Sequence, residues 1–364
     1  MKDYISFIGL GQCGMRLCNE FYGKGYTCSF INSDEGDVRG FNFEPEKVLV
    51  LKGTGTGKSL KVGTQIVEDN KTKFESFLKK NVNKNGLTIL VAGAGGGTGG
   101  SFVSPAATFL KENGYKVGVL LTLPPSILGL VPAENSLKTL KELKQHPLDF
   151  FMLIDNQMLL DELGSSTSWW GRVNKKIVEN VLAMFEILNE RKVSKEGLGS
   201  IDKGELIRCL TYGKGHIDVN HFYLTPVDFN LPDKELEAKI FKSPLTNGYN
   251  YREGLCYSVC VDIPKPFETE HMALASRIFN ITKNKIGRGI SIPGMFTDPM
   301  MGSTVRVTLI VAGLSLPKVL ESRIKNLKRD NMAFKEKHNK VDKISADILD
   351  SLDEEMLDEE FTFK

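Results

Sequence analysis

Three glycine-rich segments, each following a run rich in Val, Ile and Phe, constrain the fold of this chain more than any other feature. They occupy residues 9–14, 52–58 and 92–101. Glycine is unfavourable in a helix by about 1 kcal/mol relative to alanine, so the third segment, with six glycines between residues 93 and 100, is expected to be a loop. Glycines also let backbone N–H groups approach a phosphate at a helix N-terminus. The sequence therefore predicts a nucleotide that lies across several strand ends.

The apolar runs alternate with segments whose apolar residues are spaced by three and four, as in helices. This helical spacing occurs at residues 65–82, 101–112 and 133–144. The alternation predicts an α/β fold with a doubly wound parallel sheet and right-handed crossovers, which binds ligands at the carboxyl ends of its strands. The expected strands are residues 4–8, 27–31, 47–51, 87–92, 116–121 and 150–154.

The rest of the chain predicts a long central helix and a smaller α+β domain. Helical spacing runs over residues 169–191, after a Ser-Ser-Thr-Ser stretch expected to cap it. Strands expected at 254–262 and 303–311 flank a helix at 268–280, and Pro317 is expected to open a basic helix. We therefore divide the chain into a nucleotide-binding domain (1–168), the central helix (169–198), the α+β domain (199–316), the basic C-terminal helix (317–340) and an acidic tail (341–364).

Composition excludes several classes of protein. With 364 residues, 41% hydrophobic and 25% charged, the chain is neither disordered throughout nor collagen-like. No apolar run reaches the roughly 20 residues of a membrane helix. The start, MKDYISFIGL, lacks a signal peptide's apolar core, and the six cysteines form no CxxC pair, so we expect a cytoplasmic protein without membrane contact. Among five histidines only His216 and His221 lie close together, which predicts no metal site.

Charge is divided sharply between the last two segments. Residues 317–340 contain 8 Lys and Arg against 3 Asp and Glu, whereas residues 341–364 contain 2 Lys against 9 Asp and Glu. A solvated helix face followed by a disordered tail explains this division as well as partner binding does. Because the acidic tail would repel DNA, we expect no direct DNA binding, while a basic DNA-bound adaptor would be attracted.

Each glycine segment has another explanation when taken singly. Gly9, Gly11 and Gly14, with Asp34 after the second strand, match the dinucleotide-binding fingerprint of NAD(P)-dependent oxidoreductases. Residues 52–59 imitate the phosphate loop of ATPases but hold Lys52 where that loop needs glycine. The third segment can be purely structural. Neither enzyme class predicts glycine loops after the first, third and fourth strands together.

Six motifs, in order along the chain, resemble the tubulin/FtsZ superfamily. Residues 95–99, Gly-Gly-Gly-Thr-Gly, match its signature, and residues 11–14, Gly-Gln-Cys-Gly, are similar to the first loop of β-tubulin. The later matches resemble the ribose loop (132–135), the base-contacting loop (154–156), the start of the central helix (170–174) and the catalytic loop (199–205). The resemblance extends from Met1 to about Leu314.

The resemblance implies a GTPase that binds GTP or GDP, with Mg²⁺ held through phosphates and water, and that polymerises head to tail. Its catalytic loop would complete the site of the adjacent subunit, where Asp202 and Glu205 orient the attacking water. These acids lie three apart at an expected helix start, so capping explains them equally well. The implied nucleotide-binding residues are Gly11, Gln12, Cys13, Arg16, Asp34, Gly55, Gly57, Gly95, Gly96, Gly97, Thr98, Gly99, Glu134, Asn156, Trp170 and Asn174.

Three of these residues also have a chemical argument of their own. Trp170 begins the central helix and its ring can stack on a base, while Asn174, one turn later, can hydrogen-bond a purine edge. The alternative is that Trp169 and Trp170 both belong to the core. Asn156 follows a strand and offers a donor and an acceptor to the base, or else it merely caps a helix.

The chain departs from the family at several positions. Ser200 stands where the family usually has Asn, Glu205 where FtsZ usually has Asp, and Arg16 replaces a polar neutral residue near the base; Lys203 beside Asp202 either lowers the pKa of that acid or is solvated. The basic helix and acidic tail look more like the TubZ group of plasmid and phage partition proteins than FtsZ. We therefore expect filaments that segregate DNA through a DNA-binding adaptor. A divergent FtsZ-like division protein, a phage spindle tubulin and, more remotely, an NAD(P)-dependent oxidoreductase are the alternatives.

Overall fold

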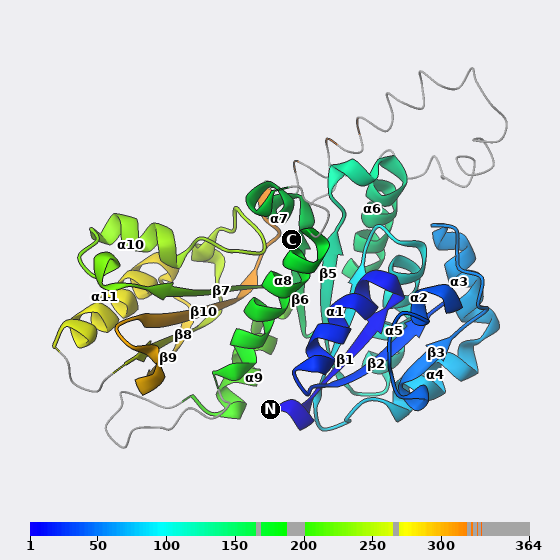
Figure 1. Ribbon diagram of the computed structural model, residues 1–364, viewed down its shortest axis with the longest axis horizontal. Coiled ribbons are helices and arrows are strands. Elements are labelled where there is room, and N and C mark those ends of the chain that lie inside the picture. The colour runs from blue at the N-terminus through cyan, green and yellow to red at the C-terminus, as the bar shows by residue number, and fades with distance from the viewer. Residues whose placement is uncertain are drawn as a thin grey trace.

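The computed structural model describes residues 1–164, 169–187, 201–264 and 269–318, together with 322, 326 and 329 (Figure 1). Within these residues ten strands form one sheet, in the order β3-β2-β1-β4-β5-β6-β7-β10-β8-β9. From β3 to β7 neighbours are parallel, and β10 runs antiparallel to both β7 and β8. The strands are β1 (Ile5–Leu10), β2 (Thr27–Asn32), β3 (Val48–Val50), β4 (Leu87–Gly93), β5 (Lys116–Leu123), β6 (Phe150–Asp155), β7 (His216–Leu224), β8 (Cys256–Ile263), β9 (Ile290–Thr297) and β10 (Val305–Leu314).

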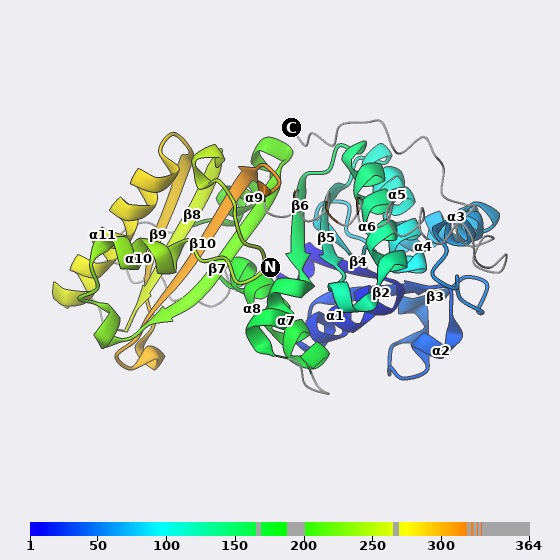
Figure 2. The ribbon, with the colours of Figure 1, turned by 90° about the horizontal axis from the view of Figure 1, so that it is seen from above.

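Helices cover both faces of this sheet, as Figure 2 shows from above. Apolar side chains of α1 (Gly11–Gly23), α8 (Trp169–Glu186) and α9 (Lys203–Thr211) share one core cluster on the first face. Those of α3 (Leu60–Asp69), α4 (Lys71–Lys80), α5 (Gly97–Glu112) and α6 (Leu130–Lys144) form a second cluster on the opposite face of the parallel half. A third cluster lies beneath α10 (Asp233–Ile240) and α11 (Thr269–Ile286) in the antiparallel half. The predicted doubly wound α/β class is confirmed.

Three local predictions differ from the structure. The helical pattern at 65–82 is two helices, because Asn70 ends α3, where its amide Nδ2 donates to the Ile66 carbonyl at 2.9 Å. The glycines at positions 97, 99 and 100 lie in α5 and not in a loop. A Cβ on Gly97 would approach Thr56 Oγ1 to 2.2 Å, so close packing requires glycine inside this helix. The third difference is that β7, β9 and α10 were not expected as separate elements.

Several segments named from the sequence lie outside the described residues. They are the Ser-Ser-Thr-Ser cap at 165–168, Ser200 and nearly all of the basic helix and the acidic tail. Of the four boundaries between the predicted segments, those after residues 168, 198 and 340 also lie there, and the division of the chain stays a prediction.

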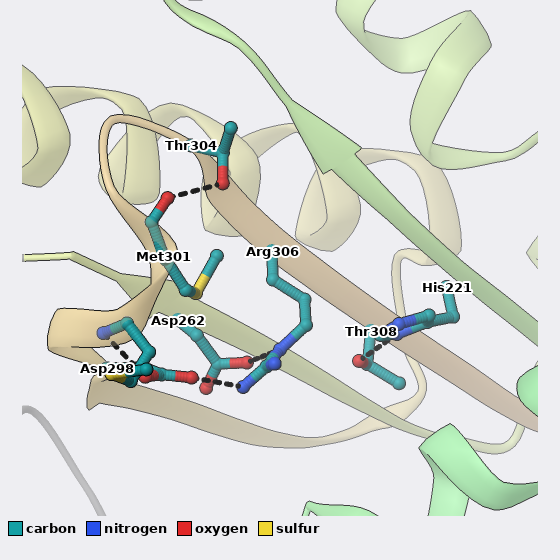
Figure 3. A network of polar contacts seen from close by, with 8 residues as sticks. His221, Asp262, Asp298, Met301, Thr304, Arg306 and Thr308 are labelled. Carbon is teal, nitrogen blue, oxygen red and sulfur yellow. Dashed lines mark hydrogen bonds and ion pairs between the residues drawn. The ribbon is translucent and has the colours of Figure 1, made fainter.

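A polar network holds the antiparallel strands together at the end of the sheet far from the parallel half (Figure 3). Arg306 on β10 donates through Nε to Asp262 Oδ2 on β8 at 2.6 Å and through a terminal nitrogen to Asp298 Oδ2 at 3.2 Å. The Asp262 side chain is 0% exposed. Nearby, His221 Nδ1 and Thr308 Oγ1 lie 2.9 Å apart across β7 and β10. In this network the guanidinium of Arg306 therefore neutralises the buried carboxylate of Asp262.

Candidate functional site

A cavity of about 650 Å³ lies at the carboxyl ends of the parallel strands, where the sequence predicts a nucleotide. All of the predicted nucleotide-binding residues except Glu134 line it. Its walls come from six parts of the chain: Leu10, Gly11, Gln12, Cys13 and Arg16; Asp34 and Asp37; Thr54, Gly55, Thr56, Gly57 and Lys58; Gly93, Gly95, Gly96, Gly97, Thr98 and Gly99; Thr122, Pro124, Leu128 and Pro132; and Asn156, Trp170 and Asn174.

Two helix N-termini meet at this cavity. α1 begins at Gly11 and α5 at Gly97, and neither helix has a side-chain cap or an acidic residue in its first turn. Gly11 has φ of +67°, and a Cβ there would lie 2.8 Å from the Gly99 backbone nitrogen, so only glycine lets the two helix starts approach. Backbone N–H groups and the positive ends of both helix dipoles thus point toward a site suited to an anion.

The segment after β3 adds a strained loop to the same cavity. Its left-handed residues include two lysines, Lys52 at φ 73° and Lys58 at φ 65°, among three glycines with positive φ. A non-glycine residue in this region costs about 1 kcal/mol or more, so other contacts must hold the loop. Asn135 Nδ2 supplies one by donating to the Lys58 carbonyl at 2.8 Å and the Gly95 carbonyl at 3.2 Å. Asn135 therefore joins two glycine loops.

The far end of the cavity carries the residues expected to contact a base. The rings of Trp169 and Trp170 stack with centroids 3.8 Å apart. Trp169 packs against the core cluster, whereas Trp170 lines the cavity together with Asn174. The two tryptophans therefore divide the roles that the sequence left open, one in the core and one at the cavity.

Asn156 is the polar group that most clearly calls for a ligand. Its side chain is buried, and Oδ1 accepts no hydrogen bond in the described part of the chain. The cap of α7 (Asn156–Leu163) is Asp155, which accepts from the Gln157 backbone N–H at 3.0 Å, so capping does not explain Asn156. An unsatisfied buried acceptor costs about 1–3 kcal/mol, which an N–H donor on a purine edge would recover. The residues present thus fit a purine nucleotide.

Several other side chains that line the cavity, among them Asp37, Asp34 and Cys13, have partners within the protein. Asp37, which sequence reasoning missed, accepts from Gln12 Nε2 at 2.6 Å and from Asn32 Nδ2 at 3.1 Å. Asp34 accepts from the Gly36 backbone N–H at 2.7 Å and so caps the short helix after β2. Burial raises the pKa of the Cys13 thiol, which lies 3.3 Å from Thr122 Oγ1 and stays protonated at neutral pH. No cysteine nucleophile results.

Glu134 is the predicted binding residue that does not line the cavity. It is buried within α6, and its neighbours Pro132 and Asn135 contact the cavity or its loops instead. Among the residues that sequence reasoning missed, Thr122 and Pro124 follow from the rule that ligands meet strand ends, since they stand at the end of β5. Asp37 has no motif to announce it.

Asp202 and Glu205 lie near the amino ends of the parallel strands, whereas the cavity lies at their carboxyl ends. Their helix, α9, contacts the segments that precede strands: the ammonium of Lys203 sits 3.5 Å from the ring centroid of Tyr4, just before β1. The two acids form a capping box, in which Asp202 Oδ1 accepts from the Glu205 N–H at 2.7 Å and Glu205 Oε2 from the Asp202 N–H at 3.0 Å. These side chains do not reach the cavity of their own chain.

The residues that the structure describes hold neither a metal centre nor a membrane span. No group of three or more His, Cys, Asp or Glu side chains in them is placed to hold a metal ion. Burial lowers the pKa of His216 to about 4, so this histidine is neutral. No helix in the same ranges is both long and apolar enough to cross a membrane.

Replacing Trp170 by Ala should weaken nucleotide binding by about 1–3 kcal/mol, because a base loses its stacking surface. Trp169→Ala is the matched control, since it should lower the free energy of unfolding more than it lowers affinity. Titration calorimetry with GDP and urea unfolding measure the two quantities. Equal affinity of the Trp170 variant and the original chain would place base stacking elsewhere.

Comparison with known proteins identifies relatives of this arrangement. Residues 4–164 match the GTPase domain of the Tubulin/FtsZ family. The tubulin-like protein CetZ of Methanothrix thermoacetophila is 26% identical over 223 residues, which cover 54% of this chain and 59% of CetZ. Cell division protein FtsZ 1 of Pyrococcus abyssi is 23% identical over 323 residues, covering 86% of this chain and 82% of FtsZ 1.

A solved structure extends the similarity over nearly the whole chain. The GTPγS-form protofilament of TubZ from Bacillus thuringiensis serovar israelensis superposes with a TM-score of 0.78 at 19% identity, covering 93% of this chain and 94% of the TubZ chain. At this identity the similarity establishes the fold.

Proposed function

We propose that this chain, whose residues 4–164 match the GTPase domain of the Tubulin/FtsZ family, binds and hydrolyses GTP in a site that a second copy of the chain completes. The observation that carries this proposal is that the cavity lies at the carboxyl ends of the parallel strands, whereas Asp202 and Glu205 lie near their amino ends. In a head-to-tail filament the α9 end of one subunit would meet the cavity of the next. The acids would then orient a water against the γ-phosphate.

The rim of the cavity supports this contact between subunits. Ile127 is 77% exposed and Leu128, which lines the cavity, is 44% exposed. Large apolar side chains so exposed beside a binding site are typical of an interaction surface. We infer that a neighbouring subunit covers them in the filament.

Within the cavity we assign the phosphates to the glycine-rich helix starts at Gly11 and Gly97, and the guanine base to Trp170, Asn174 and Asn156. A Mg²⁺ ion would be held by phosphate oxygens and water. The two carboxylates that line the cavity, Asp34 and Asp37, already accept hydrogen bonds from protein donors, which favours this arrangement over direct ligation. Bound there, the ion would neutralise developing charge on the phosphates.

Two measurements test the proposal directly. Purified protein denatured by heat should release GDP or GTP, and release of NAD would instead support the oxidoreductase alternative. GTP turnover per chain should rise with protein concentration, since each site needs a neighbour. Turnover independent of concentration, over a range in which electron microscopy shows filaments appearing, would contradict completion of the site between subunits.

We further propose that the filament segregates plasmid or phage DNA and recruits a basic, DNA-bound adaptor through residues 341–364. The support is the charge of this segment, with 9 Asp and Glu against 2 Lys, together with the likeness to TubZ in fold. Long-range attraction between such charges speeds association and weakens as salt rises.

Deleting residues 342–364 should abolish adaptor recruitment while assembly and GTP hydrolysis persist. Co-sedimentation of filaments with adaptor and DNA measures recruitment, and phosphate release measures hydrolysis. If the shortened chain no longer polymerises, the segment serves the filament itself; if it still recruits the adaptor fully, the recruitment surface lies elsewhere.

A further inference from the structure

A second cavity, of about 430 Å³, lies between α9 and the segments that precede β1 and β5. We name it the α9 pocket; its walls are Tyr4, Lys116 and one face of α9 that includes Lys203, Gly204, Arg208 and Thr211. It lies on the amino side of the parallel strands, since Lys116 is the first residue of β5. The nucleotide cavity lies on the other side, so the two sites are separate.

The charge of the α9 pocket is uniform. Lys116, Lys203 and Arg208 all line it, and among the described residues no carboxylate does. None of these three cations forms an ion pair within the described part of the chain. The nearby carboxylate of Asp149 is paired instead with Lys111, whose Nζ lies 2.7 Å from Asp149 Oδ2. Asp202 and Glu205, at the start of α9, are held in their capping box. Three cations around one small cavity favour a ligand that carries several negative charges.

The pocket also has ordered donors. Lys203 is positioned by the Tyr4 ring, at 3.5 Å from its centroid, and this contact leaves ammonium hydrogens available to a ligand. Gly204 lies in the first turn of α9, whose N-terminus is capped by the carboxylates of Asp202 and Glu205, so the helix start adds no attraction for an anion. Thr211 adds no donor, because its hydroxyl donates to the Ile207 carbonyl at 2.9 Å. The donors are therefore the three cationic side chains.

We propose that the α9 pocket binds a small multivalent oxyanion of the phosphate class, in a site distinct from the nucleotide cavity. Its volume of about 430 Å³ falls within the roughly 300–1,000 Å³ typical of small-molecule sites, so it has room for a ligand with one or two phosphate groups. Lys116 comes from β5, whereas Lys203 and Arg208 come from α9. A bound anion would join the sheet to the helix that carries Asp202 and Glu205.

Titration calorimetry with inorganic pyrophosphate, on the full chain saturated with GDP, tests this site by binding alone. We expect a saturable binding heat, and an affinity for pyrophosphate that falls as the salt concentration is raised. Lys116→Gln and Arg208→Gln should each weaken it about tenfold through loss of one charge-assisted contact. Lys80→Gln, on α4 at the other side of the domain, is the matched control and should change nothing.

Three outcomes would overturn the proposal. One is equal affinity in all variants, which would place pyrophosphate in the nucleotide cavity. Another is the absence of any heat at millimolar pyrophosphate. The third is binding that appears only after residues 342–364 are deleted, because an acidic part of the chain would then be the occupant. Since none of these readouts uses GTP hydrolysis, failure here leaves the proposed GTPase untouched.

Discussion

Replacing Glu205 by Ala should slow GTP hydrolysis about 100-fold or more while GDP affinity stays unchanged, because the proposed role of this acid is to position water in a neighbour's site. Filaments should consequently persist longer after GTP is added. Phosphate release gives the rate, calorimetry gives the affinity, and light scattering follows the polymer.

Glu205 also caps α9, so a second variant must separate the two roles. Glu205→Gln keeps an acceptor for the Asp202 N–H and therefore keeps the capping box, but it removes the charge. We expect it to be as slow as the Ala variant. A Gln variant with the original rate would assign Glu205 to the helix cap and withdraw it from catalysis.

Mixing two inactive chains tests whether the acid acts on a neighbour. Gly96→Asp should block phosphate binding, because it places a negatively charged carboxylate at the edge of the cavity. The side chain has room there, since a Cβ at Gly96 would meet only the Gly93 carbonyl oxygen, at 3.8 Å. The backbone tolerates the change because Gly96 is the N-cap of α5, where an acidic side chain is favoured. The Gly96→Asp chain still offers an intact Glu205 to the Glu205→Gln chain, which binds GTP. Activity in the mixture would support completion of the site between subunits, and a mixture as inactive as its parts would count against it.

Replacing Arg306 by Ala should lower the free energy of unfolding by about 3–5 kcal/mol, the largest loss of stability that we expect from a single change. The substitution removes the guanidinium that neutralises Asp262, whose side chain is 0% exposed, and also the contact to Asp298. Urea unfolding measures the loss. Nucleotide affinity, measured at a temperature where the variant is folded, should change little because Arg306 does not line the cavity.

An exposed pair supplies the control for this prediction. Arg39 and Glu35 lie 3.7 Å apart with side chains 79% and 63% exposed, so Arg39→Ala should cost about 0.5 kcal/mol or less. The double variant Arg306→Gln with Asp262→Asn should recover part of the loss, since the buried charge is removed with its partner. If Arg306→Ala costs no more than Arg39→Ala, the network does not stabilise the sheet.

The sequence alone predicted the parallel half of the fold and the place of the cavity. Strands that are buried on both faces, such as β1 and β4, appear as continuous apolar runs, and each is followed by glycine because a helix must start close behind it. The antiparallel half was harder to predict from the sequence. The register of β7 and β9 depends on pairing with strands distant in the chain, which no local pattern reports.

Residue roles divided in the same way. The type and spacing of Gly11, Gly97 and Trp170 were enough to predict that they meet around one ligand, since each follows a strand end or opens a helix. Asp37 lines the cavity and is held there by its contacts with Gln12 and Asn32. Glu134 is buried within α6 and does not line the cavity, although its motif resembles the ribose loop. Side-chain direction follows from packing, which the sequence does not display.

The sequence by itself determined that this chain folds as a doubly wound sheet with glycine loops at the strand ends, because backbone propensity and hydrophobic period act over a few neighbouring residues. Only the tertiary structure decided which tryptophan lines the cavity and that Asp155, not Asn156, caps α7. It also decided that Asp202 and Glu205 lie at the opposite ends of the parallel strands from the glycines. These facts depend on which distant segments pack together. That choice is made by burial and hydrogen bonding over the whole chain.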